Sequence, residues 1–100
     1  EFGTDVIFSA HVHAYQRLAP MRPDGTLDPL FGIRSFVVGT GGATLATLPA
    51  ATPVTEIQNS GTYGNVKFNL SDNAYNWQFI PVAGKTFTDS GSGVCHNAPL

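Results

Sequence analysis

Two stretches of strictly alternating apolar and polar residues stand close together between residues 65 and 80. The apolar members are Val66, Phe68 and Leu70 in the first stretch, and Tyr75, Trp77 and Phe79 in the second. Alternation with period two is typical of a strand with one buried face. Residues 71–74, Ser-Asp-Asn-Ala, tolerate the dihedral angles of a turn. The pattern predicts a β-hairpin whose aromatic face packs against a second layer, with Trp77 buried.

Two further apolar runs predict strands, at residues 5–10 and at residues 33–38. The first run is apolar almost throughout, which is typical of a strand that is buried on both faces. Proline residues and an Asp-Gly pair between residues 20 and 29 forbid helix and favour an irregular loop. These patterns predict a segment that is mostly β.

The remaining stretches predict long connections with little helix. Residues 43–54 show neither a helical nor a strand period and are expected to form a long loop. Residues 84–96 are polar and rich in glycine, with little that would fix a helix, which predicts a segment that lies along a surface. One hundred residues are enough for one small domain with one core and too few for two, so residues 1–100 are expected to form a single unit.

The composition limits the partners of this chain. A net charge of −2 with only five Lys and Arg residues leaves no basic patch for nucleic acid. No apolar stretch approaches the roughly 20 residues of a membrane span, so no membrane partner is expected. Hydrophobic residues make up 42% of the chain and charged residues only 12%, which predicts that part of the surface is covered by a partner.

His11 and His13 stand one residue apart, directly after the first predicted strand. On an extended backbone their side chains project to the same face, so both imidazoles can approach a metal ion. Such pairs also arise by chance in polar loops. The position after a strand favours a functional site, because α/β proteins build sites where strands end. Residues 39–42, Gly-Thr-Gly-Gly, lack the lysine of a P-loop; they favour a tight turn and are a candidate second edge of the site.

Residues 5–17, Asp-Val-Ile-Phe-Ser-Ala-His-Val-His-Ala-Tyr-Gln-Arg, resemble the last metal-binding motif of calcineurin-like metallophosphoesterases. The closest resemblance is to the Gly-His-x-His-x-Tyr-Glu-Arg form of purple acid phosphatases. The resemblance continues through residues 32–42, residues 62–68, the Trp77 hairpin and residues 89–91. It covers nearly the whole chain.

This resemblance implies a four-layer α/β/β/α sandwich, of which the chain would be the C-terminal portion. It also implies a two-metal phosphoester hydrolase, in which His11 binds one metal ion and His13 binds the other. The expected cofactors are two divalent or mixed-valence ions of iron, zinc or manganese. The expected substrate is a phosphate ester, and a secreted or extracellular location is implied as well.

The sequence also departs from the family pattern. Ala10 stands where the family usually has glycine, and Gln16 where it often has glutamate. The family's aspartates, bridging carboxylate, Asn-His pair and remaining histidine are absent from these residues, and no residue here is assigned a catalytic role. We therefore expect the chain alone to be inactive, with the remainder of the parent domain as its partner. The alternative is a noncatalytic β-rich binding or interaction module. Cys95 and His96 stay unassigned, because two lone ligands do not form a structural zinc site.

Overall fold

The protein is described here by a computed structural model that covers residues 4–48 and 50–96. Seven strands and no helix occur in this part of the chain, so the prediction of a mostly β segment with little helix is confirmed. The strands are β1 (Val6–Ser9), β2 (Tyr15–Leu18), β3 (Arg34–Val38), β4 (Thr55–Asn59), β5 (Gly64–Leu70), β6 (Ala74–Pro81) and β7 (Ser90–Val94). A search of the described residues finds no helix long and apolar enough to cross a membrane.

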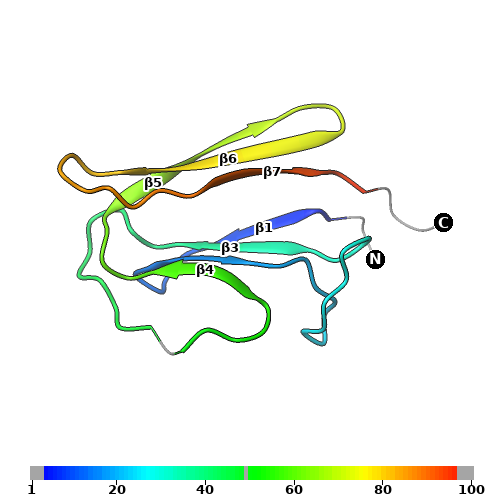
Figure 1. Cartoon of the computed structure of the whole chain (residues 1–100), viewed down its shortest axis with the longest axis horizontal. Helices are drawn as coiled ribbons and strands as arrows, with labels where there is room; N and C mark the ends of the chain where they lie inside the picture. The colour runs from blue at the N-terminus through cyan, green and yellow to red at the C-terminus, as the bar shows by residue number, and fades with distance from the viewer. Residues whose placement is uncertain (1–3, 49, 97–100) are drawn as a thin grey trace.

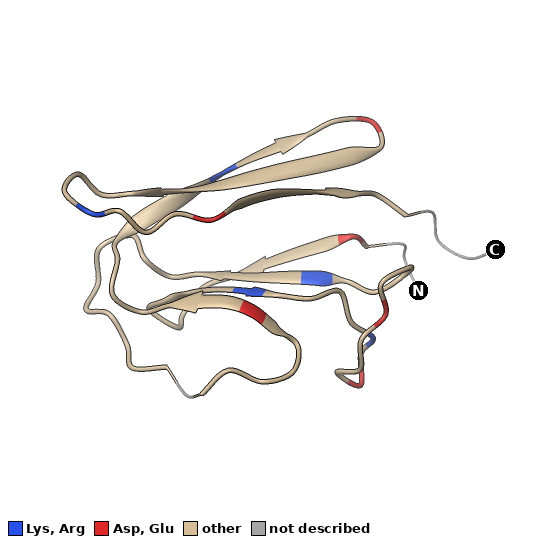
Figure 2. Cartoon of the chain, in the orientation of Figure 1, with Lys and Arg blue, Asp and Glu red and all other residues tan. Residues whose placement is uncertain are grey.

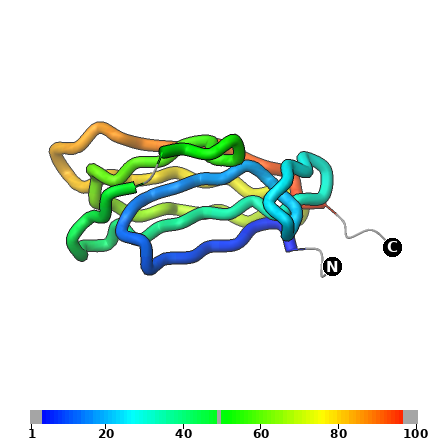
Figure 3. Tube along the Cα trace, turned by 90° about the horizontal axis from the view of Figure 1, so that it is seen from below, coloured from blue at the N-terminus to red at the C-terminus, as the bar shows by residue number. Residues whose placement is uncertain are grey.

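The strands form two sheets that lie one over the other (Figure 1). The first sheet has the order β1-β3-β2-β4, and the second has the order β5-β6-β7. In the first sheet β1 runs parallel to β3, while β2 runs antiparallel to both β3 and β4. Figure 3 shows the strands of this sheet side by side from below. Because β3 lies between β1 and β2, the chain crosses the end of β3 when it passes from β1 to β2.

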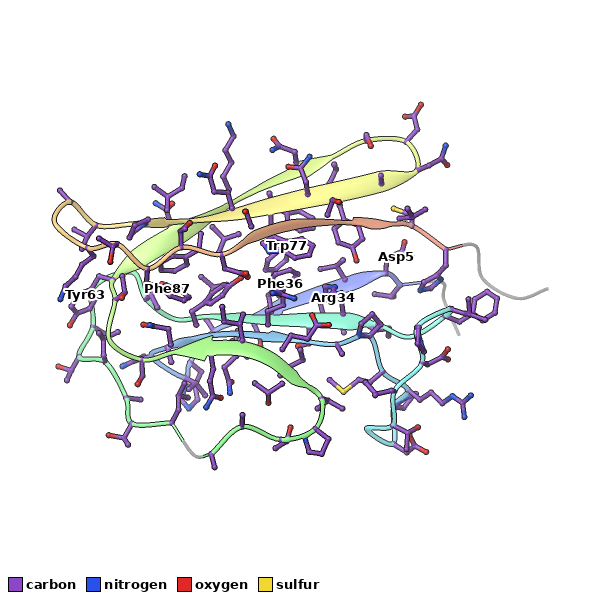
Figure 4. The ribbon with its side chains drawn as sticks, in the orientation of Figure 1. Asp5, Arg34, Phe36, Tyr63, Trp77 and Phe87 are labelled. Carbon is purple, nitrogen blue, oxygen red and sulfur yellow. The ribbon has the colours of Figure 1, made fainter. Side chains whose placement is uncertain are left out.

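The predicted hairpin is present as β5 and β6. Its register pairs Phe68 with Trp77 and Val66 with Phe79. Trp77 is only 4% exposed, which confirms its predicted burial. The ring of Trp77 meets that of Phe36 on β3 edge to face, with 5.2 Å between the ring centroids (Figure 4). The core therefore lies between the two sheets, and its buried members are Tyr15, Phe36, Tyr75, Trp77 and Phe79.

The first strand lies at the edge of its sheet, so the prediction that it is buried on both faces is wrong. β1 pairs with β3 alone, and the side chains of Ile7 and Phe8 are each 46% exposed. Phe8 still packs against the core, since its ring lies 5.0 Å from that of Phe36 and 4.8 Å from that of Phe68. A continuous apolar run indicates a strand with two apolar faces, but it does not indicate whether those faces are covered.

The described part of the glycine-rich tail contains no helix, as predicted, but the sequence pattern does not predict the strand β7 that forms within it. In β7, Gly91 pairs with Trp77 and Gly93 pairs with Tyr75. A Cβ atom at Gly91 would lie 2.5 Å from the Trp77 ring, and one at Gly93 would lie 2.4 Å from the Tyr75 ring. The glycines leave room for aromatic rings to cover the backbone of β7, so here they support a strand.

Strands β2 and β4 are likewise not predicted by the sequence pattern. They pair with each other around a register shift between Arg17 and Leu18. Charged residues are sparse on both sheets (Figure 2). Glu56 of β4 pairs with both Arg17 and Arg34, whose side chains are largely buried. These contacts between strands far apart in the sequence hold β2 and β4 in place.

Candidate metal centre

His11 and His13 lie in the connection between β1 and β2, where the chain crosses the end of β3. The backbone bends at residues 11–14 instead of staying extended, and His11 has a φ angle of 76°. The premise that strand alternation places the two imidazoles on one face is therefore wrong. A residue other than glycine in the left-handed region costs of order 1–3 kcal/mol, and such residues cluster at functional sites.

The imidazole of His13 is held by a backbone carbonyl. Its Nδ1 atom lies 2.7 Å from the carbonyl oxygen of Thr44. Because a carbonyl oxygen only accepts, Nδ1 carries the proton, and in the neutral ring Nε2 keeps a free lone pair. Histidine ligands of metal ions usually donate their other ring N–H in this way, which fixes the tautomer and the ring orientation. His11, in contrast, is exposed.

The Gly39–Gly42 turn lies directly against the histidine segment. The Gly39 N–H donates to the carbonyl oxygen of Ala14 at 3.0 Å, and the Ala46 N–H donates to that of His13 at 2.9 Å. A Cβ atom at Gly39 would lie only 2.0 Å from the Val12 carbonyl oxygen. Glycine is therefore needed where the β1–β2 connection crosses β3. The structure thus brings the candidate second edge of the site against the histidines.

The acidic side chains serve other contacts. Asp24 accepts hydrogen bonds from the hydroxyl and the N–H of Thr26, and these bonds lower the pKa of its carboxyl. The Phe31 N–H donates to the Asp28 carboxylate, and this bond lowers the pKa of Asp28. Both aspartates belong to the loop between β2 and β3. Among residues 4–48 and 50–96, no group of three or more His, Cys, Asp or Glu side chains is placed to hold a metal ion.

The chemistry of the two donors suits a transition metal. Neutral imidazole is a good ligand for zinc and iron, and His13 presents Nε2 with its Nδ1–H already satisfied. Two imidazoles leave most coordination positions to water or to groups of another polypeptide segment. The residues present therefore fit part of a metal site. The sequence singled out both histidines but gave no signal for Thr44, because its contribution comes from a backbone carbonyl.

Cys95 and His96, which the sequence left unassigned, join the ends of two strands. The His96 N–H donates to Asp5 Oδ1 at 2.8 Å, and the His96 Nε2 atom lies 3.3 Å from the same oxygen and 3.2 Å from the Gly32 carbonyl oxygen. Burial and the neighbouring Asp5 raise the pKa of the Cys95 thiol. A thiol with a raised pKa is a poor nucleophile and a poor metal ligand. These residues fasten the end of β7 to the start of β1.

No family model matches this chain, and comparisons with curated proteins and with solved structures give no match either.

Proposed function

We propose that this chain is the C-terminal portion of a metal-dependent phosphoester hydrolase that resembles purple acid phosphatases. In this proposal His11 supplies a ligand to one metal ion and His13 supplies a ligand to a second. The observation that carries the proposal is the hydrogen bond from His13 Nδ1 to the Thr44 carbonyl oxygen, at 2.7 Å. It leaves Nε2 unprotonated and oriented, as a ligand must be. The left-handed backbone at His11 is a second support, because strain of this kind is retained where function requires it.

A pair of metal ions would grip the phosphate group, generate a hydroxide nucleophile and neutralise charge in the transition state. The part played by this chain is narrower. Its two imidazoles hold positions in the coordination shell, and its 39–46 loop keeps the His13 ring from rotating. We assign no acid, base or nucleophile to this chain, and the remaining ligands would come from the rest of the parent domain.

The open side of the two sheets supports a larger parent. β1 is one edge strand of the first sheet and β5 is one edge strand of the second, and the contact between Phe8 and Phe68 brings these two edges together. A hollow of about 340 Å³ lies along them, lined by Asp5, Val6, Phe8, Phe68, Leu70, Tyr75 and Cys95. Parallel strand pairs are normally covered on both faces. In the proposed four-layer α/β/β/α parent, further elements would cover this side. We propose that this parent acts outside the cell.

The same hollow favours the alternative of a noncatalytic binding module. Its lining is mainly apolar, as in many sites for small molecules or peptides. The aromatic residues of β6 do not contribute a surface platform to such a module, because Tyr75, Trp77 and Phe79 are buried. The two functions differ in their response to metal ions.

Metal titration of the full chain tests the proposal. Zinc or manganese is added to the wild-type chain and to the variants His11→Ala, His13→Ala and His96→Ala, and binding is followed by NMR and calorimetry. We expect weak binding that each of the first two substitutions reduces and that the His11→Ala, His13→Ala double variant loses. His96→Ala is the matched control, because this histidine lies at the end of β7 and contacts Asp5. Equal binding by the wild type and the His11→Ala, His13→Ala double variant would contradict the proposal and favour the binding module.

A second experiment addresses the reaction itself. Hydrolysis of an aryl phosphate is measured with iron, zinc or manganese for this chain, for a parent protein that includes it and for the histidine variants of the parent. We expect no turnover by the chain alone, because two imidazoles cannot hold two cations together against their repulsion. We expect each parent variant to lose most of its activity, because each substitution removes a ligand of one metal ion. An active parent that lacks both histidines would exclude the ligand assignment.

A further inference from the structure

We propose that Asp89 is a positioning residue for the histidine pair: its buried carboxylate fixes strand β2, and β2 in turn holds His13 in its metal-binding orientation. This inference rests on the function proposed above, and it assigns a role to a residue more than 70 positions away in the sequence. The side-chain hydrogen bonds of Asp89 go to Tyr15, Arg17 and Trp77, so Asp89 acts on the histidines through other residues.

The Asp89 carboxylate lies between the two sheets, and its side chain is only 6% exposed. Its Oδ2 atom accepts hydrogen bonds from the Tyr15 hydroxyl at 2.6 Å and from Arg17 Nε at 2.8 Å. Its Oδ1 atom accepts a further bond from the Arg17 guanidinium at 3.1 Å. From the other sheet, Trp77 Nε1 donates to Oδ2 at 3.1 Å. Because Tyr15 and Arg17 belong to β2 and Trp77 belongs to β6, one carboxylate joins the sheets.

The position of β2 determines the position of the histidine segment. Tyr15 is the first residue of β2 and has no exposed surface, and Ala14 before it is equally buried. Consecutive Cα atoms are about 3.8 Å apart, so His13 can lie no more than about 7.6 Å from Tyr15 along the chain. Because only the buried Ala14 separates the two residues, a shift of Tyr15 displaces His13.

The other side of the histidine segment is anchored independently. The Thr40 hydroxyl donates to the Gly64 carbonyl oxygen at 2.8 Å, and the Gly64 N–H donates to the Thr40 carbonyl oxygen at 3.0 Å. These bonds fasten the start of the 39–46 loop to β5. The Thr44 carbonyl that orients His13 belongs to this loop. Asp89 and Thr40 therefore hold the two segments that the His13–Thr44 bond joins, in addition to the backbone bonds from Gly39 to Ala14 and from Ala46 to His13.

Packing alone does not replace the Asp89 anchor. Without the carboxylate, the Tyr15 hydroxyl would be buried with no acceptor, and the Arg17 guanidinium would keep Glu56 of β4 as its acidic partner. A buried polar or charged group that loses a partner is incompletely compensated, and this destabilises the arrangement that holds it. We therefore expect the start of β2 to be held less firmly between the sheets, which loosens the contacts of Ala14 and His13 with the 39–46 loop.

The test uses the full chain with Zn²⁺ as the probe and compares three variants. Asp89→Asn removes the charge at nearly constant shape, and Tyr15→Phe removes one hydrogen bond and keeps the ring. Phe68→Leu is the control, because Phe68 lies on β5 and its ring packs against Phe8, Phe36 and Tyr75. All are measured where circular dichroism shows them folded. The readouts are the Zn²⁺ affinity and the imidazole ¹⁵N spectrum, which reports whether His13 Nδ1 carries the proton.

We expect the Zn²⁺ affinity to fall about tenfold in Asp89→Asn, the lower end of the effect of outer partners on metal ligands, and less in Tyr15→Phe. Both variants should lose the uniform Nδ1–H signal of His13, while Phe68→Leu keeps it. If Asp89→Asn does not fold, Tyr15→Phe decides the question. Unchanged affinity and an unchanged His13 signal would overturn the positioning role. A wild-type chain that binds no Zn²⁺ through its histidines would instead refute the proposed function. The ¹⁵N signal of His13 would still show whether Asp89 positions this ring, because it does not depend on Zn²⁺ binding.

Discussion

Replacement of Trp77 by alanine tests whether the two sheets are held together mainly by their aromatic core. Trp77 is 4% exposed, and its ring lies 5.2 Å from that of Phe36 in the opposite sheet. The guanidinium carbons of Arg17 and Arg34 each lie 5.2 Å from the Trp77 ring centroid, and Figure 4 shows Arg34 near this core. The substitution removes all of these contacts at once and leaves a cavity between the sheets.

The expected loss in the free energy of unfolding is about 3–5 kcal/mol, the range for a buried tryptophan replaced by alanine. A domain of this size has about 5–15 kcal/mol in total, so the variant should be only marginally folded. The melting temperature should fall by about 12 °C or more, since 1 kcal/mol corresponds to about 4–8 °C in small domains. Trp77→Phe keeps an aromatic ring but removes the indole N–H that donates to the Asp89 carboxylate. We expect this variant to lose about 2 kcal/mol of unfolding free energy.

The assay is urea unfolding followed by far-ultraviolet circular dichroism, because the substitution removes the fluorescent residue itself. Leu70→Ala is the matched control: Leu70 lies on the paired strand but is 76% exposed, so its loss should change stability by only about 0.5 kcal/mol. In the wild type, the tryptophan emission should be shifted to short wavelength. An alanine variant as stable as the Leu70→Ala control, or the emission of a water-exposed indole, would refute the reasoning.

Three further outcomes are expected. Gly39→Ala should destabilise the chain and disturb the His13 NMR signals, because the added Cβ would lie 2.0 Å from the Val12 carbonyl oxygen. The control Gly41→Ala should change neither, because no atom lies within 4 Å of its added Cβ, and equal effects of the two substitutions would refute the close approach at Gly39. Burial would raise the pKa of Asp89, but hydrogen bonds from β2 hold it below its usual value, so its contribution to stability is full above about pH 4 and is lost as the pH falls through the lower folded pKa. Unfolding measured from pH 7 to pH 2 should show this loss in the wild type and not in Asp89→Asn, and parallel profiles would contradict it. Gly91→Ala should weaken β7 and expose the ring that covers it, and unchanged urea unfolding and tryptophan emission would contradict that packing.

Local patterns identified the elements whose signal lies within a few neighbouring residues. The β5–β6 hairpin follows from alternation on both sides of a turn, and the burial of Trp77 follows from its place on the apolar face. The strand at residues 34–38 was marked by its β-branched and aromatic residues. The spacing of His11 and His13 likewise marked the candidate site, because the chemistry of these side chains does not depend on the fold.

The tertiary structure decided what depends on partners distant in the sequence. A glycine-rich tail becomes strand β7 only because the rings of Tyr75 and Trp77 occupy the space above its glycines. The apolar run of β1 becomes an edge strand because pairing, which the run itself does not encode, leaves it beside β3 alone. The orientation of His13 depends on a backbone carbonyl 31 residues away, and backbone carbonyls are common to all residues. Side-chain type is written in the sequence, whereas the backbone groups and the open edges that surround each side chain are fixed only when the strands pair.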